Sequence, residues 1–448
     1  MSIKKQAKTI CIISAIFVFF FWYYYYITGR NTDYKKPFII YPKIKKTKFP
    51  TACGIRVENN PMLKVDNLKT YLLGSYIEHR LEVKTLKTIA IVLRSEKAEY
   101  QCFLCCNGTN ISVPATYSIH SDHFGFNYGT ADITCQVPET CTTPMHVAIT
   151  SPSPLGKASQ NVKVIQPVRN QQTRDNFTYD FTVCISVMYD YTNVLELVQT
   201  MEMFKILGIQ RVAIYKTNCD PNVQKVLDYY VMQKFVEVIP WTISSHLKVS
   251  RGWKNWESPG ELHYFGQIPA LNDCVYRYMY QSRYVALQDL DEIILPVPKG
   301  LENWTELLHE LERKYGRNVG FEFENNFFPL IIKETNPAYS PDLWKKVMGV
   351  NILQYVKKLR IDPTTFNNFK VIVNPRSVYS ASVHGLLQSK GGTIRVDSNI
   401  AHMYHFRNMT INVPENFLLQ DTRLRDYAGR LIPAISNVLT EVLDVQTI

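Results

Sequence analysis

The feature that most constrains the fold is a regular alternation of apolar, strand-like runs with amphipathic helical segments between residues 181 and 288. The pattern predicts strands at 181–187, 211–215, 235–240 and 284–288, and helices at 193–208, 223–231 and 267–281. Gly208 marks the end of the first helix. Continuous apolar strands that alternate with helices are typical of a parallel sheet covered by helices. The sequence therefore predicts an α/β domain with a mostly parallel central sheet.

Two carboxylates follow the last of these strands directly, in the run Asp289-Leu290-Asp291-Glu292. In doubly wound sheets, ligands bind where the strands end at their carboxyl edge. The side chains of Asp289 and Asp291 can converge there on one divalent cation, and hard oxygen ligands suit Mn²⁺ or Mg²⁺ bound to a diphosphate. Acidic residues that only cap a strand are the alternative. The buried strand before the motif and the apolar run 293–296 after it favour a ligand site.

Six motifs occur in order between Tyr191 and Arg407, over about half of the chain. They are GluMetPheLysIleLeuGlyIle (202–209), ValLeuAspTyrTyr (226–230), AlaLeuAsnAspCysValTyrArgTyr (270–278), AspLeuAspGluIleIleLeuPro (289–296), ValHisGly (383–385) and HisPheArg (405–407). In combination they resemble glycosyltransferase family 92, whose members are type II membrane enzymes with a GT-A-like nucleotide-sugar-binding domain. The family usually has HisTyrArg at the last motif, so HisPheArg lacks one phenol group.

This resemblance implies an inverting transfer of galactose from UDP-galactose to a galactose or fucose residue of a glycoprotein glycan. It implies that Asp289 and Asp291 hold Mn²⁺ or another divalent cation on the UDP diphosphate. His405 would complete the metal shell or touch the phosphate, with His384 as its competitor for this role. Arg407 would balance the charge of the leaving group.

The remaining site predictions concern two amides and a base. Gln267 and Asn272 lie on the helix before the Asp289 strand and are expected to face the nucleotide, unless their amides are only solvated or capping. An inverting transfer also needs a carboxylate that takes the proton of the acceptor hydroxyl. We select Glu324, at the end of the run 319–325, and count it as catalytic together with Asp291. Its rivals are Glu322, Glu261 and Asp362.

Residues 85–170 carry short β-type runs separated by turn residues, which predicts a small β-sandwich-like accessory domain. Five of the nine cysteines after residue 27 lie in this region. The CysPheLeuCysCys run at 102–106 has a zinc-like spacing, but a second ligand pair at finger spacing is absent, so disulfides are expected. Because nine is odd, at least one thiol is left over. The pairing stays open.

Residues 10–27 have no charged side chain, and eighteen helical residues span about 27 Å, close to the thickness of a bilayer core. No small-residue cleavage pattern follows, so the sequence favours a retained anchor over a cleaved signal peptide. Sequons and cysteines after the span place the body in the secretory lumen. The expectation is a single-pass type II protein of the Golgi membrane. The predicted glycosylation sites are Asn107, Asn110, Asn176, Asn303 and Asn408.

The predicted layout is a cytoplasmic tail (1–9), a signal-anchor (10–27), a stem (28–80), the β-rich domain (85–170) and a catalytic domain (177–440). The formal net charge is +11, but ten basic residues and one acidic residue fall within 1–48, so the rest lacks the excess of basic residues that nucleic acid would require. The expected partners are UDP-galactose, a glycan acceptor and the membrane; a homodimer stays open.

Two other classes of function are alternatives for this sequence. A membrane-anchored, calcium-dependent glycan-binding protein would use Asp289 and Asp291, but calcium needs more oxygen ligands than this motif offers. A phosphoryl-transfer enzyme is disfavoured, because no G-x-x-x-x-G-K-[ST] motif occurs in the chain.

Overall fold

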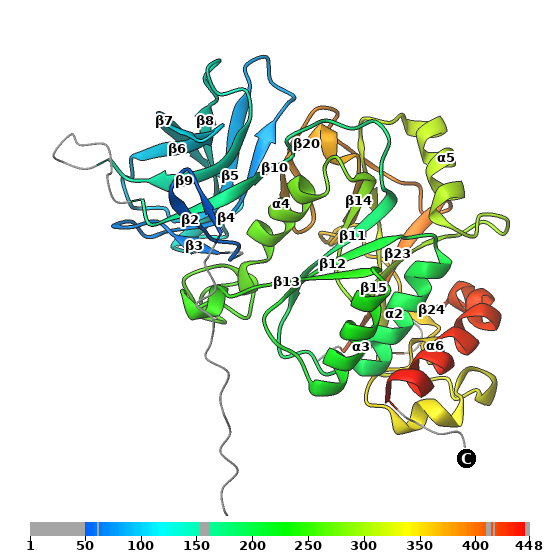
Figure 1. Ribbon diagram of the computed structural model, residues 1–448. Coiled ribbons are helices and arrows are strands. Elements are labelled where there is room, and N and C mark those ends of the chain that lie inside the picture. Colours follow the sequence, from blue (N-terminus) through cyan, green and yellow to red (C-terminus); the bar gives the residue numbers. More distant parts are fainter. Residues whose placement is uncertain (1–49, 61, 153–161, 409–413, 415–416, 444–448) are drawn as a thin grey trace, which may run out of the picture. The chain divides into compact units, whose positions relative to one another are not determined.

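The computed structural model describes residues 50–60, 62–152, 162–408, 414 and 417–443 (Figure 1). The chain from Pro50 onward forms one compact unit. The predicted tail at 1–9, the predicted anchor at 10–27 and the first part of the predicted stem lie outside the described residues. Within the described ranges, no helix is both long and apolar enough to cross a membrane.

A ten-stranded sheet occupies the first part of the described chain (Figure 1). Its order is β1-β2-β10-β9-β6-β7-β8-β5-β4-β3, and a further pairing of β10 with β4 closes β4 to β10 into a seven-stranded barrel. Neighbouring strands are antiparallel, except that β10 runs parallel to β2 and β4. The strands are β1 (Thr51–Ala52), β2 (Ile55–Val57), β3 (Leu63–Lys64), β4 (Thr70–Glu78), β5 (Thr85–Leu93), β6 (Tyr100–Cys106), β7 (Thr109–Ile119), β8 (Tyr128–Gln136), β9 (Pro144–Thr150) and β10 (Val164–Arg169).

A seven-stranded sheet follows, in the order β13-β12-β11-β14-β19-β16-β22. Its strands are β11 (Tyr179–Met188), β12 (Arg211–Lys216), β13 (Val236–Pro240), β14 (Ser282–Gln288), β16 (Gly320–Phe323), β19 (Lys370–Val373) and β22 (Thr393–Arg395). The helices are α2 (Val194–Ile206), α3 (Pro221–Met232), α4 (Gln267–Arg277), α5 (Trp304–Tyr315) and α6 (Ala428–Leu443). Every strand and helix predicted between 181 and 288 forms, with ends that shift by a few residues.

The predicted fold class is wrong. Of the described residues, 37% are in strands and 24% in helices, so the chain is mostly sheet rather than an α/β protein on a parallel sheet. The seven-stranded sheet is mixed, because β19 runs antiparallel to both of its neighbours. The accessory part is a closed barrel rather than a sandwich. Strand alternation fits a barrel and a sandwich equally well, since strand pairing is decided by distant partners.

The range predicted as a stem also differs in the structure. Strands β1 to β4 fall between residues 51 and 78, and β4 is buried along its whole length. The side chains of β4 are buried on both faces, because Leu72 and Ile77 pack in the barrel interior and Leu73 and Tyr76 pack in the cluster that includes residues of α4. This part of the chain therefore contributes to the barrel.

The seven-stranded sheet lies between two apolar layers because successive strand residues face opposite sides. In β12, Val212 and Ile214 pack in one core cluster with residues of α2, α3 and α6. Ala213 and Tyr215 pack in the other cluster, which includes residues of α4 and of barrel strands β4 and β5. The barrel and the sheet thus share a core.

A smaller three-stranded sheet, in the order β15-β23-β17, completes the part of the fold that carries the site. Its strands are β15 (Glu292–Pro296), β23 (Ala401–Arg407) and β17 (Asn325–Pro329). Two strand pairs accompany it, β18 (Lys357–Leu359) with β24 (Leu418–Gln420), and β20 (Val378–Ser382) with β21 (Gly385–Ser389). Asparagine and aspartate side chains start three of the helices by capping their first turn, namely Asn193, Asp220 and Asn303.

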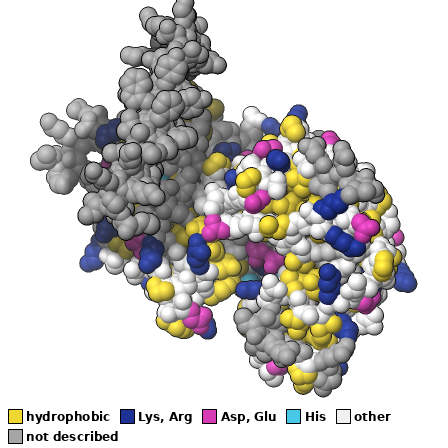
Figure 2. Space-filling model, turned by 90° about the horizontal axis from the view of Figure 1, so that it is seen from below, with side chains coloured by type: hydrophobic (Ala, Val, Ile, Leu, Met, Phe, Trp, Pro, Cys, Tyr) yellow, Lys and Arg dark blue, Asp and Glu magenta, His cyan; other side chains and the backbone are white. Residues whose placement is uncertain are grey.

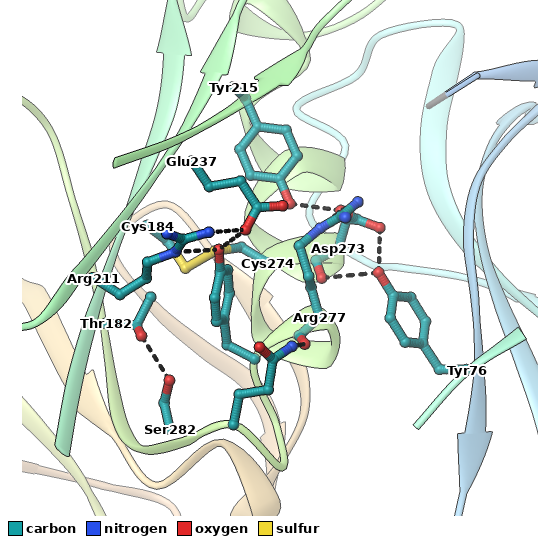
Figure 3. Close-up of a disulfide and its surroundings, with 12 residues drawn as sticks. Tyr76, Thr182, Cys184, Arg211, Tyr215, Glu237, Asp273, Cys274, Arg277 and Ser282 are labelled. Atoms are coloured by element: carbon teal, nitrogen blue, oxygen red, sulfur yellow. Dashed lines mark hydrogen bonds and ion pairs between the residues drawn. A yellow bond between two sulfur atoms is a disulfide. The ribbon is translucent and has the colours of Figure 1, made fainter. Parts of the chain in front are cut away.

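The expectation of disulfides is confirmed. Cys184 of β11 is bonded to Cys274 of α4 (Figure 3). Among the described cysteines, Cys219 is the free thiol. All three cysteines of the zinc-like run are in disulfides, namely Cys53–Cys105, Cys102–Cys135 and Cys106–Cys141.

Candidate functional site

A cavity of about 290 Å³ opens where β11 and β14 end. The segment after β11, the start of α4 and the Asp289–Glu292 turn line it together with residues from β23. Three polar atoms of lining side chains, Ser186 Oγ, Gln267 Oε1 and His384 Nε2, are buried and have no hydrogen-bond partner among the described residues. Buried polar atoms are normally paired, so unpaired atoms in a cavity wall indicate a ligand site.

Asp289 lines the cavity and also forms an ion pair with Lys370. Its Oδ2 is 2.8 Å from Lys370 Nζ, and its Oδ1 accepts a hydrogen bond from Gln267 Nε2 at 2.9 Å. Lys370, from β19, is only 2% exposed and also lies 3.4 Å from Glu292 Oε2. Burial lowers the pKa of Lys370, but Asp289 and Glu292 outweigh it and hold that pKa above its usual value. Lys370 therefore stays charged and neutralises Asp289.

Asp291, Glu292 and His405 form the cluster with metal-ligand spacing, with ligand atoms that all lie within 4.8 Å of one another. His405 Nε2 is 3.2 Å from Asp291 Oδ2, and His405 Nδ1 is 3.7 Å from Glu292 Oε1. The antiparallel pairing of β15 with β23 brings Glu292 opposite His405. Two carboxylates and an imidazole suit a divalent cation such as Mn²⁺. The residues present thus fit a metal site.

The charges in this cluster depend on one another. Burial raises the pKa of Glu292, and the carboxylates of Asp289 and Asp291 add to it, although Lys370 opposes them. Burial also disfavours charge on Asp291 and His405, but their mutual hydrogen bond outweighs it, so the pKa of Asp291 falls and the pKa of His405 rises. The hydrogen bond between Asp291 and His405 therefore favours the charged form of each, and a cation would compete for this carboxylate.

Glu196, in the first turn of α2, is a cavity residue that the sequence analysis missed. Its Oε2 accepts hydrogen bonds from Tyr191 Oη at 3.0 Å and from Asn193 Nδ2 at 2.7 Å. Burial, and then the charge of Asp291, raise the pKa of Glu196 to about 8. An acidic residue in the first turn of a helix is common, so the sequence offered no signal that separated Glu196 from an ordinary helix start.

The structure places two of the three predicted nucleotide-binding residues in the cavity lining and the third outside it. Gln267 and Arg407 line the cavity, and Arg407 is exposed. Asn272 is buried outside the cavity lining, where it donates to Ile268 O and Ala381 O and accepts from Ala381 N. Its amide therefore links α4 to β20 by hydrogen bonds, so its role here is structural.

The four base candidates lie outside the cavity lining. Glu324 connects β16 to β17, where its carbonyl oxygen accepts from Met403 N. Glu261 accepts from Lys248 N at 2.9 Å, and exposed Asp362 caps its own turn through Thr364. His384, the predicted competitor of His405, does line the cavity. The predicted ligands thus meet in one place, whereas Glu324, Glu322, Glu261 and Asp362 do not.

The predicted glycosylation sites all lie within the described residues. Four of these asparagines are exposed, namely Asn107, Asn110, Asn176 and Asn408. Asn303 is half-buried, and its side chain accepts from Glu306 N at 3.0 Å as the cap of α5.

The surface is mixed in charge. On the described part of the face in Figure 2, Lys and Arg side chains are dispersed among acidic and hydrophobic ones and form no continuous basic field.

The part of the chain that carries this cavity matches a known family. Residues 179–438, more than half of the chain, match the model of glycosyltransferase family 92. The chain belongs to glycosyltransferase family 92. The resemblance found in the sequence is thereby confirmed, and the match includes the Asp289–Glu292 turn, Lys370 and His405.

The chain is also similar to two proteins of Caenorhabditis elegans. "Beta-1,4-galactosyltransferase galt-1" is 21% identical over 276 residues, which cover 60% of this chain and 56% of that protein. "Glycosyltransferase family 92 protein F13G3.3" is 25% identical over 114 residues, which cover 25% of this chain and 22% of that protein. This family 92 chain therefore spans about half the length of the first relative and less of the second.

Proposed function

We propose that this chain is a glycosyltransferase that moves galactose from UDP-galactose to a galactose or fucose residue of a glycoprotein glycan, with inversion. The observation that carries the proposal is the Asp291–Glu292–His405 cluster in a cavity of the family-matched region. The name of the relative galt-1 supports galactose as the transferred sugar.

Asp291, Glu292 and His405 are the residues that would hold a divalent cation, with Mn²⁺ as the expected ion. When bound, such an ion neutralises the diphosphate and stabilises the charge that develops on the leaving UDP. Lys370 keeps Asp289 in place, and Gln267 fixes the same carboxylate from α4. Arg407 offers an exposed guanidinium at the cavity wall, which can pair with a phosphate oxygen.

We assign the base to Glu196 in place of Glu324. A general base works best when its pKa is near the working pH, and Glu196 is the lining carboxylate outside the Asp289–Glu292 turn. Tyr191 and Asn193 hold one of its oxygens, so the other is available to an acceptor hydroxyl.

The proposed setting is the Golgi membrane, with a type II topology and the body in the lumen. The sequence from 10 to 27, the sequons and the disulfides support this setting.

The deciding experiment replaces Asp291 by asparagine. The amide keeps the shape of the side chain and removes a charge, so we expect transfer from UDP-galactose to fall about a thousandfold or more. Glu292→Gln should follow Asp291→Asn closely, because Glu292 is in the cluster, and added Mn²⁺ should partly restore both. Asp289→Asn tests the alternative in which Asp289 itself binds the ion.

The assay measures transfer and UDP-galactose hydrolysis at several Mn²⁺ concentrations, with thermal melting as the control for folding. Near-native activity of folded Asp291→Asn protein without added metal would refute the metal assignment. Absence of both transfer and hydrolysis in the wild-type protein would refute the proposed donor.

A further inference from the structure

Aromatic rings gather along one side of the cavity. Trp253, Tyr264 and His384 all line it, and we call these three residues the aromatic wall. The rings of Trp253 and His384 are nearly parallel, with centroids 4.9 Å apart and planes 13° apart. The rings of Trp253 and Tyr264 are 5.6 Å and 27° apart. Neither the proposed metal cluster nor the proposed base uses these side chains.

His384 offers a hydrogen-bond acceptor that the protein leaves unused. Its Nδ1 is 3.3 Å from Phe369 O, and a carbonyl only accepts, so Nδ1 carries the proton. Burial lowers the pKa of His384 to about 3, which keeps the ring neutral. The lone pair is then on Nε2, which is buried without a partner among the described residues. A buried acceptor without a partner is unfavourable, and a hydroxyl of a ligand can offset this cost.

The wall is held in place before any ligand arrives. Ser250 Oγ donates to Ser258 O at 2.6 Å and so closes the loop that carries Trp253. Gly260 is required in this loop, because a Cβ there would lie 2.4 Å from Ser250 N. From the barrel, Phe124 packs edge-on against Trp253 with ring centroids 5.4 Å apart. The barrel therefore supports one side of the cavity.

The backbone around Tyr264 is strained in a way that fits a binding site. Tyr264 and Phe265 have φ values of 28° and 51°, which side chains other than glycine rarely adopt. Such backbone conformations are unfavourable and tend to occur where function requires them. Here the strain directs both rings to the cavity lining.

The wall continues outward to the solvent. Phe366 is 73% exposed, and its ring lies edge-on to His384 with centroids 6.2 Å apart. Of the two proposed ligands, the nucleotide sugar would meet the Asp291–Glu292–His405 cluster inside the cavity, whereas a glycan on a glycoprotein must reach in from solvent. A row of rings from the surface to the cavity matches the second ligand.

We propose that the aromatic wall, with Phe366 at its outer end, binds a pyranose ring of the acceptor glycan, and that His384 Nε2 accepts a hydrogen bond from one of its hydroxyls. This inference rests on the proposed function and names the acceptor side of the same site. A pyranose has an apolar face of C–H groups that packs on aromatic rings and a rim of hydroxyls that donate. It needs no charged partner, and the wall is made of neutral rings.

The test uses the full chain and separates acceptor from donor. His384→Phe keeps a ring and removes the acceptor nitrogen, so the acceptor KM should rise about tenfold, which corresponds to one lost hydrogen bond. Phe366→Ala should raise the acceptor KM as well, and its exposed position makes misfolding a minor concern. In both variants the donor KM and UDP-galactose hydrolysis without acceptor should stay within about twofold of wild type. Trp256→Ala is the matched control, since Trp256 is 79% exposed in the Trp253 loop but does not line the cavity.

A second arm measures binding of a galactose-terminated and a fucose-containing oligosaccharide by calorimetry, without any donor. Wild-type protein should bind one of them, and His384→Phe should weaken this binding by a similar factor. An unchanged acceptor KM in both His384→Phe and Phe366→Ala, or a raised donor KM instead, would overturn the inference. So would the absence of oligosaccharide binding by the wild type. If the wild-type protein binds an oligosaccharide but does not turn over UDP-galactose, the donor assignment is rejected and the proposal for the aromatic wall is supported.

Discussion

Glu196 lies buried in the first turn of α2, close enough to Asp291 for their charges to interact. Hydrogen bonds from Tyr191 and Asn193 stabilise its charged form. Burial and the negative charge of Asp291 outweigh these contacts and raise the pKa of Glu196 to about 8. A carboxyl group that is neutral in the folded chain and charged in the unfolded chain makes stability depend on pH.

Glu196→Gln is expected to alter this dependence with a defined sign. The pKa is near 4.5 in the unfolded chain and about 8 in the folded one, so the stabilisation from the protonated group is complete below pH 4.5 and is lost as the pH rises to 8. The neutral variant avoids this loss. Relative to the wild type, the free energy of unfolding of Glu196→Gln should therefore increase as the pH rises, by on the order of 4 kcal/mol at pH 8.

Thermal melts between pH 5 and 9 in a chelating buffer measure this difference, and parallel pH profiles for the two proteins would contradict it. As the proposed base, the same variant should lose transfer by about a hundredfold or more while it still binds UDP. If Glu196→Gln keeps its activity, another carboxylate must be the base.

At the scale of elements, α4 fixes the site through both of its ends and its middle. Gln267 at its start holds Asp289, and Asn272 bonds to Ala381. Cys274 joins the helix to Cys184 of β11, across 90 residues of chain (Figure 3). The helix is thereby connected to the strand whose end forms one wall of the cavity.

Replacing Cys184 and Cys274 by alanine together should lower the free energy of unfolding by about 2–5 kcal/mol, because the unfolded chain regains the freedom that the 90-residue crosslink removes. Urea unfolding under oxidising conditions measures the effect. Cys219→Ser is the matched control, since Cys219 is in no disulfide and serine can keep its contact with Gln224, and it should change stability by less than about 0.5 kcal/mol. Equal stability of the double variant and the wild type would show that packing alone holds α4.

At the scale of the whole molecule, a buried carboxylate joins the barrel to the seven-stranded sheet. Tyr76 of β4 and Tyr215 of β12 each donate to Asp273 at 2.5 Å, and Arg277 pairs with it at 2.7 Å (Figure 3). Gly74 is needed beside them, because a Cβ there would lie 2.5 Å from Asp273 Oδ1. Burial opposes the charge of Asp273, but Arg277 and the two phenols lower its pKa. The barrel is therefore part of the same folded unit as the site.

The topology is tested on the whole molecule as well. If the body is luminal, exposed sequons such as Asn107, Asn176 and Asn408 should carry glycans, and peptide-N-glycosidase should increase gel mobility after expression in animal cells. Asn303 should carry less glycan, because its side chain accepts a hydrogen bond as the cap of α5. An unchanged mobility would count against the luminal body, and a mature N-terminus beyond Gly29 would exclude the anchor.

The sequence alone determined the strands and helices from 181 to 288, because their patterns are local, and it located the Asp289–Glu292 turn at the end of a strand. It also placed the region 179–438 in its family. Only the tertiary structure decided that the barrel closes and that β19 enters the sheet against its neighbours, since these pairings join segments far apart in sequence. The same holds for the site. Lys370 neutralises Asp289, and His405 joins Asp291 and Glu292, because packing brings β19 and β23 to the end of β14.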